Sequence, residues 1–303
     1  MLPSYTKTYH STPYPSISPS RPDLSAKDKV ILVTGAGSGI GQATAIAFAQ
    51  ADAKALILCG RRTGALQDTK AKIEALQKTT HVLAIQLDVS DEDSVDEAFA
   101  RVKEEVGKID ILINAAGHLG DMSFLKDMSL SNFWTSVEIN LKGPFLVSRA
   151  FLRSTIPTAT APKTLILLSS IVGGLPSPQF IAGPQSYPIS KIAEAKLAEA
   201  LAAENTSHFR AYALQPGIVE SAMSEKSVSM APDPEATRAA YPWDEPELPA
   251  RFMLWLCSKR GECVPSGRFL WINWDVDELE AKKEEMEKDS GLLTMGLMGW
   301  PFV

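Results

Sequence analysis

The stretch Ile31-Leu-Val-Thr34-Gly35-Ala36-Gly37-Ser38-Gly39-Ile40-Gly41 decides the fold that this sequence predicts. Its first residues belong to an apolar run, 29–33, that is typical of a buried parallel strand. A glycine-rich turn follows, and residues 42–50 then carry apolar side chains at helical spacing. Glycine lets backbone N–H groups approach a phosphate, and a helix N-terminus adds unpaired donors and a positive dipole end. The stretch therefore predicts a phosphate-binding loop, although an ordinary strand–helix turn would show a similar local pattern.

The composition is that of an ordinary globular domain. At 303 residues, with 45% hydrophobic and 22% charged residues, the chain is long enough for one large α/β domain or two small ones. Its net charge of −6 argues against nucleic acid or an anionic membrane as a partner. The three cysteines form neither a disulfide framework nor a metal-ligand pattern, so we expect reduced thiols and no metal. Neither a signal-peptide core nor a membrane-length apolar segment is recognisable, and we expect a cytoplasmic protein.

Strand-like and helix-like segments alternate along most of the chain. The expected strands are 29–33, 54–59, 81–87, 109–113, 164–168, 209–214 and 268–274. The expected helices are 42–50, 63–78, one that begins at residue 90, 129–156 with an interruption near 143–144, 186–205, 248–258 and 277–289. Continuous apolar strands alternating with helices predict an α/β fold: a Rossmann-like, doubly wound parallel sheet of about seven strands in a single domain.

Three regions are expected along the sequence. Residues 1–27, rich in Pro, Ser, Tyr and Thr, predict an extended surface arm or a disordered segment. Residues 28–275 form the α/β domain, with an irregular, proline-containing substrate loop at about 217–249. Residues 276–303 combine a charged helix with an apolar tail, and that tail packs on its own core, on the mouth of the active site or on a partner subunit.

Five motifs in a fixed order carry a family resemblance. They are the Thr-Gly-x-x-x-Gly-x-Gly loop that begins at Thr34, Asn114-Ala115-Ala116-Gly117, Asn140, Ser169-Ser170 and Tyr187-Pro188-Ile189-Ser190-Lys191. Together they resemble the short-chain dehydrogenase/reductase family of the single-domain type, over roughly residues 29–274. The chain departs from the family pattern at Ala115, which replaces a second asparagine. It also departs in the longer gap between Ser170 and Tyr187, where extra residues fall in 174–183.

The resemblance implies catalytic roles for Asn140, Ser170, Tyr187 and Lys191. Tyr187 and Lys191 are four residues apart on an expected helix and therefore share a face. A tyrosine hydroxyl ordinarily loses its proton near pH 10, and a nearby ammonium favours the phenolate. By resemblance, Tyr187 exchanges a proton with the substrate oxygen, Lys191 also bonds the nicotinamide ribose and Ser170 polarises the carbonyl. Asn140 would anchor a water in the proton relay.

The resemblance also implies a nicotinamide cofactor site. Its expected residues are Gly35, Gly37, Ser38, Gly39, Ile40, Gly41, Arg61, Arg62, Asp88, Val89, Asn114, Ala115, Ala116, Gly117, Tyr187, Lys191, Pro216, Gly217, Ile218, Val219 and Ser221. The second strand ends in Gly60 and two arginines, where an acidic residue would favour NAD. Because arginine suits a phosphate, we expect NADP(H) to be preferred, with Arg61 as the main contact and Ser38 as a second one. Alternatively, both arginines are solvated charges at a helix start.

The sequence therefore predicts an oxidoreductase that moves a hydride between NADP(H) and a carbonyl or secondary alcohol. Methionines and aromatic residues in the substrate loop and the tail suggest a fairly large, apolar ketone. One alternative is an NADP-binding regulator or scaffold without redox turnover, and another is non-redox chemistry with the same four residues. By resemblance we expect a homodimer or homotetramer that pairs through the helices at 129–156 and 186–205.

Overall fold

A parallel sheet of seven strands organises the computed structural model, which describes residues 4–76, 79–121, 123–154, 162–173, 185–204 and 209–296. The strands are β1 (Val30–Thr34), β2 (Ala55–Gly60), β3 (His81–Gln86), β4 (Ile111–Asn114), β5 (Lys163–Leu168), β6 (Phe209–Gln215) and β9 (Phe269–Trp271). Their order in the sheet is β3-β2-β1-β4-β5-β6-β9, and every neighbouring pair is parallel. The chain changes direction across the sheet between β1 and β4, and in such sheets this switch point is where ligands bind.

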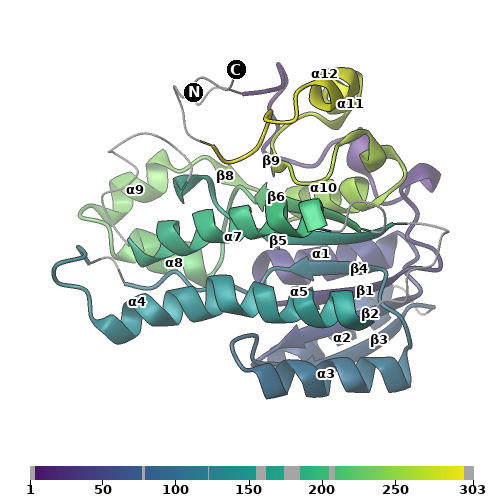
Figure 1. The fold of residues 1–303 in the computed structure, drawn as a ribbon, viewed down its shortest axis with the longest axis horizontal. Coiled ribbons are helices and arrows are strands. Elements are labelled where there is room, and N and C mark those ends of the chain that lie inside the picture. Colours follow the sequence, from purple (N-terminus) through teal and green to yellow (C-terminus); the bar gives the residue numbers. More distant parts are fainter. Residues whose placement is uncertain are drawn as a thin grey trace.

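Helices cover both faces of the sheet (Figure 1). One layer contains α1 (Gly39–Gln50), α2 (Thr63–Leu76) and α10 (Glu247–Cys257), which pack on one another through α1. The other contains α3 (Glu92–Glu105), α4 (Leu130–Val137), α5 (Gly143–Ser154) and α7 (Ser186–Glu204), with α3 packed on α5 and α4 on α7. The predicted doubly wound parallel sheet is confirmed.

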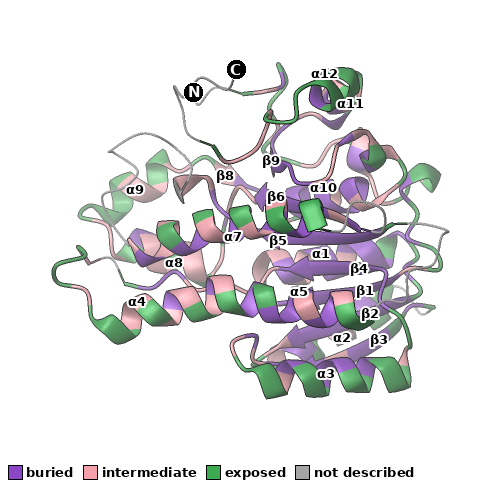
Figure 2. Cartoon of the chain, in the orientation of Figure 1, coloured by how far each residue is buried: buried purple, intermediate pink, exposed green. Residues whose placement is uncertain are grey.

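The core lies between these layers. The residues of β1, β4 and β5 are all buried, and Figure 2 shows the central strands almost uniformly in the colour of buried residues. A strand covered on both faces needs apolar side chains on both sides, which is why these strands are recognisable as continuous apolar runs. The observed strands agree with the expected ones to within a few residues, and the last strand is shorter than its expected range of 268–274.

The long helical pattern at 129–156 is divided by a π turn, η3 (Glu138–Lys142). Pro144 has no N–H to donate to the carbonyl of Asn140, four residues earlier, so a regular α-helix cannot continue through this point. Instead, the N–H of Gly143 donates to the carbonyl of Glu138, and the turn widens. The expected ends of helices at 77–78, 155–156 and 205 and the loop at 174–183 lie outside the described residues.

The segment at 217–249 is more regular than its prolines led us to expect. It contains β7 (Ile218–Val219), α8 (Ala222–Ser229), α9 (Pro234–Ala240) and β8 (Trp243–Asp244), and β7 pairs in parallel with β8. The side chain of Ser221 accepts the N–H of Ser224, and that of Asp233 accepts the N–H of Ala236. These are helix N-caps, so the polar residues of this segment begin short helices, and Pro234 occupies the first helical position.

The first and last segments that the structure describes both contact the β9 edge of the sheet. In the N-terminal segment, which carries the 3₁₀ turns η1 (Pro15–Ile17) and η2 (Pro22–Leu24), the side chains of Ile17 and Leu24 are fully buried in the core. Tyr9 forms a β-bridge with Trp274, and the carbonyl of Leu293 accepts the N–H of Phe269. The described part of the N-terminal segment is thus packed on the domain, whereas its composition predicted an extended surface arm or a disordered segment.

The C-terminal region contains α11 (Val276–Ala281) and α12 (Lys283–Lys288), followed by a tail. Leu292, Leu293 and Met295 of this tail pack against the main core, which is one of the three destinations we considered for it. The apolar residues from position 297 onward lie outside the described residues. Within the part of the chain that the structure describes, no helix combines the length and the apolar character needed to cross a membrane.

Candidate active site

A cavity of about 450 Å³ lies at the carboxyl ends of the central strands. Many residues expected to bind the cofactor line it: Gly35, Gly37, Ser38, Gly39, Ile40, Gly41, Arg61, Arg62, Asp88, Val89, Ala115, Ala116, Gly117, Tyr187, Lys191, Pro216 and Ser221. Sequence reasoning did not assign the apolar lining by Leu66, Leu87, Ile139 and Leu168 to this site, whereas Met223 is one of the methionines expected in the substrate loop. Leu87 and Leu168 stand at or just after the ends of strands, and this position could have identified them.

The glycine loop packs closely on itself and on the loop after β4 because it lacks side chains. Gly35 has a φ of +68°, and a Cβ atom there would lie 2.9 Å from the carbonyl oxygen of Ala115. A Cβ at Gly41 would lie 2.4 Å from the carbonyl oxygen of Gly35. The hydroxyl of Thr34 accepts the N–H groups of Ala115 and Ala116, which fixes the neighbouring loop. With the start of α1 at Gly39, these residues fit the pyrophosphate of a dinucleotide.

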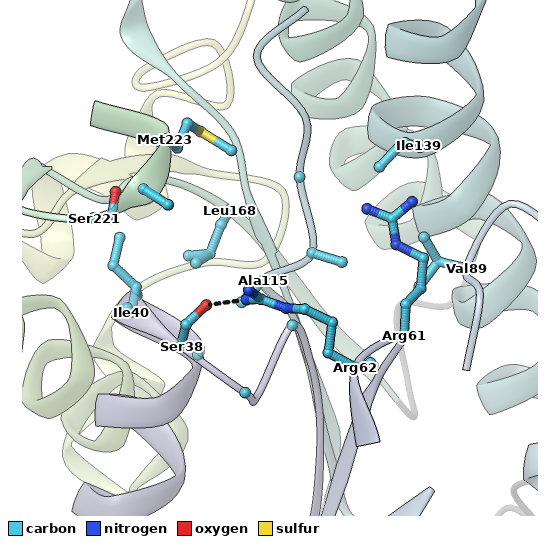
Figure 3. A pocket seen from close by; sticks show the side chains of 18 of the residues that line it. Ser38, Ile40, Arg61, Arg62, Val89, Ala115, Ile139, Leu168, Ser221 and Met223 are labelled. Carbon is cyan, nitrogen blue, oxygen red and sulfur yellow. Dashed lines mark hydrogen bonds between the residues drawn. The ribbon is translucent and has the colours of Figure 1, made fainter. Parts of the chain in front are cut away.

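The two arginines after β2 take different directions (Figure 3). Arg62 reaches across to Ser38, and its Nη2 donates to the Ser38 hydroxyl at 3.2 Å. Arg61 points instead toward Val89 and Ile139. The structure therefore places Arg62 against Ser38, whereas the sequence led us to expect Arg61 as the main phosphate contact. A guanidinium and a hydroxyl at one end of the cavity are a donor set suited to a phosphate group.

Asp88 remains ionised near the end of β3. Burial raises the pKa of its carboxyl group, but two hydrogen bonds from Ser90 and the charges of Arg61 and Lys142 more than offset this, and the pKa falls. Its backbone N–H donates to the hydroxyl of Ser94. Asp88 and Val89 thus line the cavity, where the sequence predicted that they belong to the cofactor site.

Two asparagines expected at the site lie behind the cavity surface. Asn114 is buried at the end of β4, and its amide group donates to the hydroxyl of Ser148 at 3.4 Å. Asn140 is fully buried in the π turn, where it accepts the N–H of His118 and donates to the His118 carbonyl, both at 2.7 Å. Its amide nitrogen also donates to Ser190 at 3.0 Å. Asn140 thus joins the loop after β4 to α7, and its part in a proton relay stays a prediction.

Ser170, Tyr187 and Lys191 come together at the end of β5 and the start of α7. The Ser170 hydroxyl hydrogen-bonds the Tyr187 side chain, and Lys191 Nζ lies 5.9 Å from the centre of the Tyr187 ring. The neighbouring Ser169 instead donates its hydroxyl to the backbone carbonyl of Lys191 at 2.6 Å. The two serines therefore have different partners, and of the two it is Ser169 that lines the cavity. The contact of Ser170 with a substrate stays a prediction.

The protonation of Tyr187 depends on opposing influences. Burial raises the pKa of its hydroxyl, while the positive charge of Lys191 lowers it. The negative charge of Glu194 raises the pKa again, and the hydrogen bond with Ser170 lowers it, with a net rise. Tyr187 therefore carries its proton at neutral pH and can act as an acid toward a bound carbonyl oxygen.

The segment after β6 contributes only part of its expected contacts. Pro216 and Ser221 line the cavity, but Gly217, Ile218 and Val219 are not among the lining residues. They lie against Asp244 instead, whose carboxylate accepts the N–H of Ile218 at 2.8 Å. Burial raises the pKa of Asp244 to about 6, although the hydrogen bonds from Ile218 and Asn273 lower it. This carboxyl group ties β7 to β8 and so holds the base of the segment 217–249.

Comparisons with known proteins agree with this architecture. The model of the short chain dehydrogenase family matches residues 29–232. The chain is 35% identical over 286 residues to short chain dehydrogenase mpl6 of Monascus purpureus, covering 93% of this chain and 92% of that protein. It is 31% identical over 294 residues to short chain dehydrogenase/reductase AacuD of Aspergillus aculeatus, covering 97% of this chain and 96% of that protein.

A solved structure is similar over most of its length. A short-chain type dehydrogenase/reductase from Mycobacterium marinum matches with a TM-score of 0.72 and 27% identity, covering 82% of this chain and 96% of that chain. The chain belongs to the short chain dehydrogenase family, whose members are oxidoreductases that bind a nicotinamide cofactor.

Proposed function

We propose that this protein is an NADP(H)-dependent oxidoreductase that interconverts a carbonyl compound and a secondary alcohol. The observation that carries the proposal is that Tyr187 and Lys191 line the same cavity as the glycine loop, with Ser170 beside Tyr187. The cavity thus offers an anion cradle and a proton-transferring group in one continuous space.

The residues at the end of β5 handle the substrate oxygen and its proton. Ser170 donates a hydrogen bond to the carbonyl oxygen, and Tyr187 gives that oxygen its proton in the direction of reduction. Lys191 supplies positive charge beside the Tyr187 ring and donates to the nicotinamide ribose. The bound cofactor supplies or accepts the hydride. In the direction of oxidation, Tyr187 takes the proton back.

The preference for NADP(H) rests on Arg62 and Ser38. Their side chains are hydrogen-bonded to each other and line the cavity next to Gly60, where β2 ends. A 2′-phosphate would accept hydrogen bonds from the guanidinium and the hydroxyl together. Gly60 has no carboxylate to grip the two ribose hydroxyls of NAD or to repel that phosphate.

The proposed substrate is a fairly large, apolar ketone. Met223 lines the cavity from α8, and Leu168 and Ile139 contribute further apolar surface. A flexible thioether adapts to irregular apolar ligands. Turnover confined to small, polar sugars in a substrate screen would contradict this part of the proposal.

We also propose a homodimer or homotetramer with a cytoplasmic location. Several apolar side chains on α4, α5 and α7 are exposed: Leu130, Trp134, Phe145, Ile189 and Ile192. Helices that pair through these positions would remove them from water. The three cysteines are free thiols, which supports a reducing compartment. Light scattering that shows a monomer at micromolar concentration would contradict the assembly.

The deciding experiment measures the consumption of NADPH and of NADH in the presence of a panel of aromatic and alicyclic ketones. We expect NADPH to be consumed by the wild type and not by Tyr187→Phe, which should still bind NADPH because it retains the cavity. Replacing Arg62 by leucine should raise the KM for NADPH by about tenfold or more and leave that for NADH unchanged. Arg61→Leu is the matched control, with a smaller effect expected.

Two outcomes would contradict these assignments. Binding of NADPH without turnover of any compound would favour a regulatory or scaffold role over catalysis. A preference of the wild type for NADH would contradict the role assigned to Arg62 and Ser38.

A further inference from the structure

Glu194 is a fully buried carboxyl group beside the proposed catalytic lysine. It lies three residues after Lys191 on α7, and its Oε2 is 2.7 Å from Lys191 Nζ. The exposed fraction of the side chain is 0% for Glu194 and 4% for Lys191. No motif of the sequence analysis includes Glu194.

Burying a carboxyl group at this position costs free energy. Its second oxygen, Oε1, is buried and has no hydrogen-bond partner among the groups that the structure describes. The neighbouring positions on the same side of α7, Ala195 and Ala198, are apolar and buried. Well-packed apolar residues often replace buried ion pairs without loss of stability. Packing alone therefore does not account for a glutamate here, and its hydrogen bond to Lys191 is the feature that an apolar residue could not supply.

The bonds of Lys191 explain what that contact achieves. An ammonium group has three donors. One donates to the carbonyl of Leu168 at 2.6 Å and a second donates to Glu194 at 2.7 Å. With these two directions fixed, the third donor is also fixed, and Lys191 lines the cavity. Two anchors, one at the end of β5 and one on α7, thus hold the ammonium group at the wall of the cavity that Tyr187 also lines.

The surroundings of the pair leave its charges unscreened. Lys191 and Tyr187 are the titratable groups that face Glu194, and both lie on the same helix. The elements packed against α7 are α4, η3, β5, β6 and the turn η4 (Ile171–Gly173). The charged residues of these elements have other surroundings. Lys163 pairs with Asp110, and Arg210 donates to Thr164. Glu138 is exposed, and the charge of Lys142 lowers the pKa of Asp88.

We propose that Glu194 is a positioning residue, which holds the Lys191 ammonium in place and offsets its charge so that the Tyr187 hydroxyl keeps its proton. The directions of the pKa shifts agree, since Glu194 raises the pKa of Tyr187 while Lys191 lowers it. Burial raises the pKa of Glu194 itself to about 7, against the influence of Lys191. The proposal deepens the proposed function and rests on it for the role of Tyr187.

Three substitutions separate positioning from charge. Glu194→Gln keeps an acceptor for Lys191 and removes the negative charge. Glu194→Leu removes both, and Glu194→Asp keeps the charge. The matched control is Glu204→Gln, because Glu204 is an exposed glutamate near the end of the same helix, more than three turns from Lys191. Circular dichroism and thermal melts establish that each variant is folded.

The first measurement is the dissociation constant of NADPH, from the quenching of protein fluorescence. With Lys191 no longer held, Glu194→Leu should weaken binding by about tenfold, while Glu194→Gln and Glu204→Gln stay near the wild type. Because no turnover is needed, this readout remains decisive if no carbonyl compound reacts. NADPH binding by the wild type with no turnover would contradict the proposed function. The dissociation constants of the Glu194 variants would still test whether Glu194 positions Lys191.

The second measurement is the pH profile of alcohol oxidation. Glu194→Gln should lower the apparent pKa by about one pH unit, and Glu194→Asp should restore the wild-type profile. An unchanged profile in Glu194→Gln together with wild-type NADPH binding in Glu194→Leu would overturn the proposal. So would a Glu194→Gln protein that fails to fold while Glu194→Asp folds, because the charge would then serve the fold.

Discussion

Two buried lysine–carboxylate pairs lie at opposite ends of the same strand, β5. At its amino end, Lys163 Nζ is 2.6 Å from Asp110 Oδ1, and Asp110 immediately precedes β4. At its carboxyl end, Lys191 donates both to Glu194 and to the carbonyl of Leu168, the last residue of the strand. The two pairs are chemically alike, but only the second faces the cavity.

The pairs differ in how fully their carboxylates are satisfied. Asp110 accepts from Lys163 with one oxygen and from the N–H of Val30 with the other, at 2.9 Å. Burial raises the pKa of Asp110, but these bonds and the charges of Lys163 and Lys108 more than offset it, and the pKa falls. Glu194 has a partner on one oxygen only, and burial raises its pKa. The first pair supports the fold, whereas the second leaves one carboxylate oxygen without a hydrogen-bond partner, beside the tyrosine that we propose transfers a proton.

The largest expected effect is that of Lys191→Met on turnover. We expect kcat/KM to fall by about 10⁴-fold, since Tyr187 loses the ammonium beside its ring. The free energy of unfolding should change by only about 1 kcal/mol, because Glu194, freed of its partner, can bind a proton and become neutral. Steady-state kinetics and urea unfolding measure the two quantities. The control is Lys196→Met, an exposed lysine on the same helix, and a loss of less than tenfold in Lys191→Met would contradict the assignment.

The second effect is that of Asp110→Asn on stability. Removing one partner of a buried pair leaves the other charge unpaired, and we expect a loss of about 4 kcal/mol in the free energy of unfolding. The turnover of each folded molecule should not change, because Asp110 lies at the amino end of β4, whereas the cavity lies at the carboxyl ends of the strands. Glu284→Gln removes an exposed ion pair with Lys288 and should cost less than about 0.5 kcal/mol. An Asp110→Asn variant with unchanged stability and lost turnover would contradict the purely structural role assigned to the Lys163–Asp110 pair.

The fold was predictable because its determinants are local. Parallel strands covered on both faces must be apolar throughout. Gly35 and Gly39 have positive φ angles, and a side chain at Gly35 or Gly41 would collide with the backbone. The N-terminal segment was harder to predict, because its two buried residues, Ile17 and Leu24, lie among prolines and serines. The turn η1, which carries Ile17, packs on α10 and α11, and no local pattern reveals contacts with elements so distant in the sequence.

Parts of the site depend on tertiary packing in the same way. Arg61 and Arg62 are adjacent, and only the direction in which β2 ends determines which of them reaches Ser38. Glu194 looks in the sequence like the other glutamates of an alanine-rich helix, such as the exposed Glu204. Its spacing of three residues from Lys191 was the available signal. That signal becomes specific only when α7 packs on β5 and β6 and buries this face.

The smallest expected effect is an opposite pH dependence of the two carboxyl groups. The pKa of Asp110 is lowered by folding, so its stabilisation is present above about pH 4 and is lost as the pH falls through the folded value. The pKa of Glu194 is raised by folding, so its contribution is complete below about pH 4.5 and is lost as the pH rises through about 7. For Glu194 the change across this window is on the order of 3 kcal/mol.

Urea unfolding between pH 3 and 8 measures how the free energy of unfolding depends on pH. Comparison of the wild type with each amide variant gives the contribution of each carboxyl group. The free energy of unfolding of the wild type minus that of Glu194→Gln should decrease from about pH 4.5 to 7. The corresponding difference for Asp110→Asn should be constant over that window and decrease only in acid. If both differences decreased in acid, Glu194 would be a fully satisfied ion pair like Asp110. Its carboxylate would then stabilise the fold, and the contrast between the two ends of β5 would disappear.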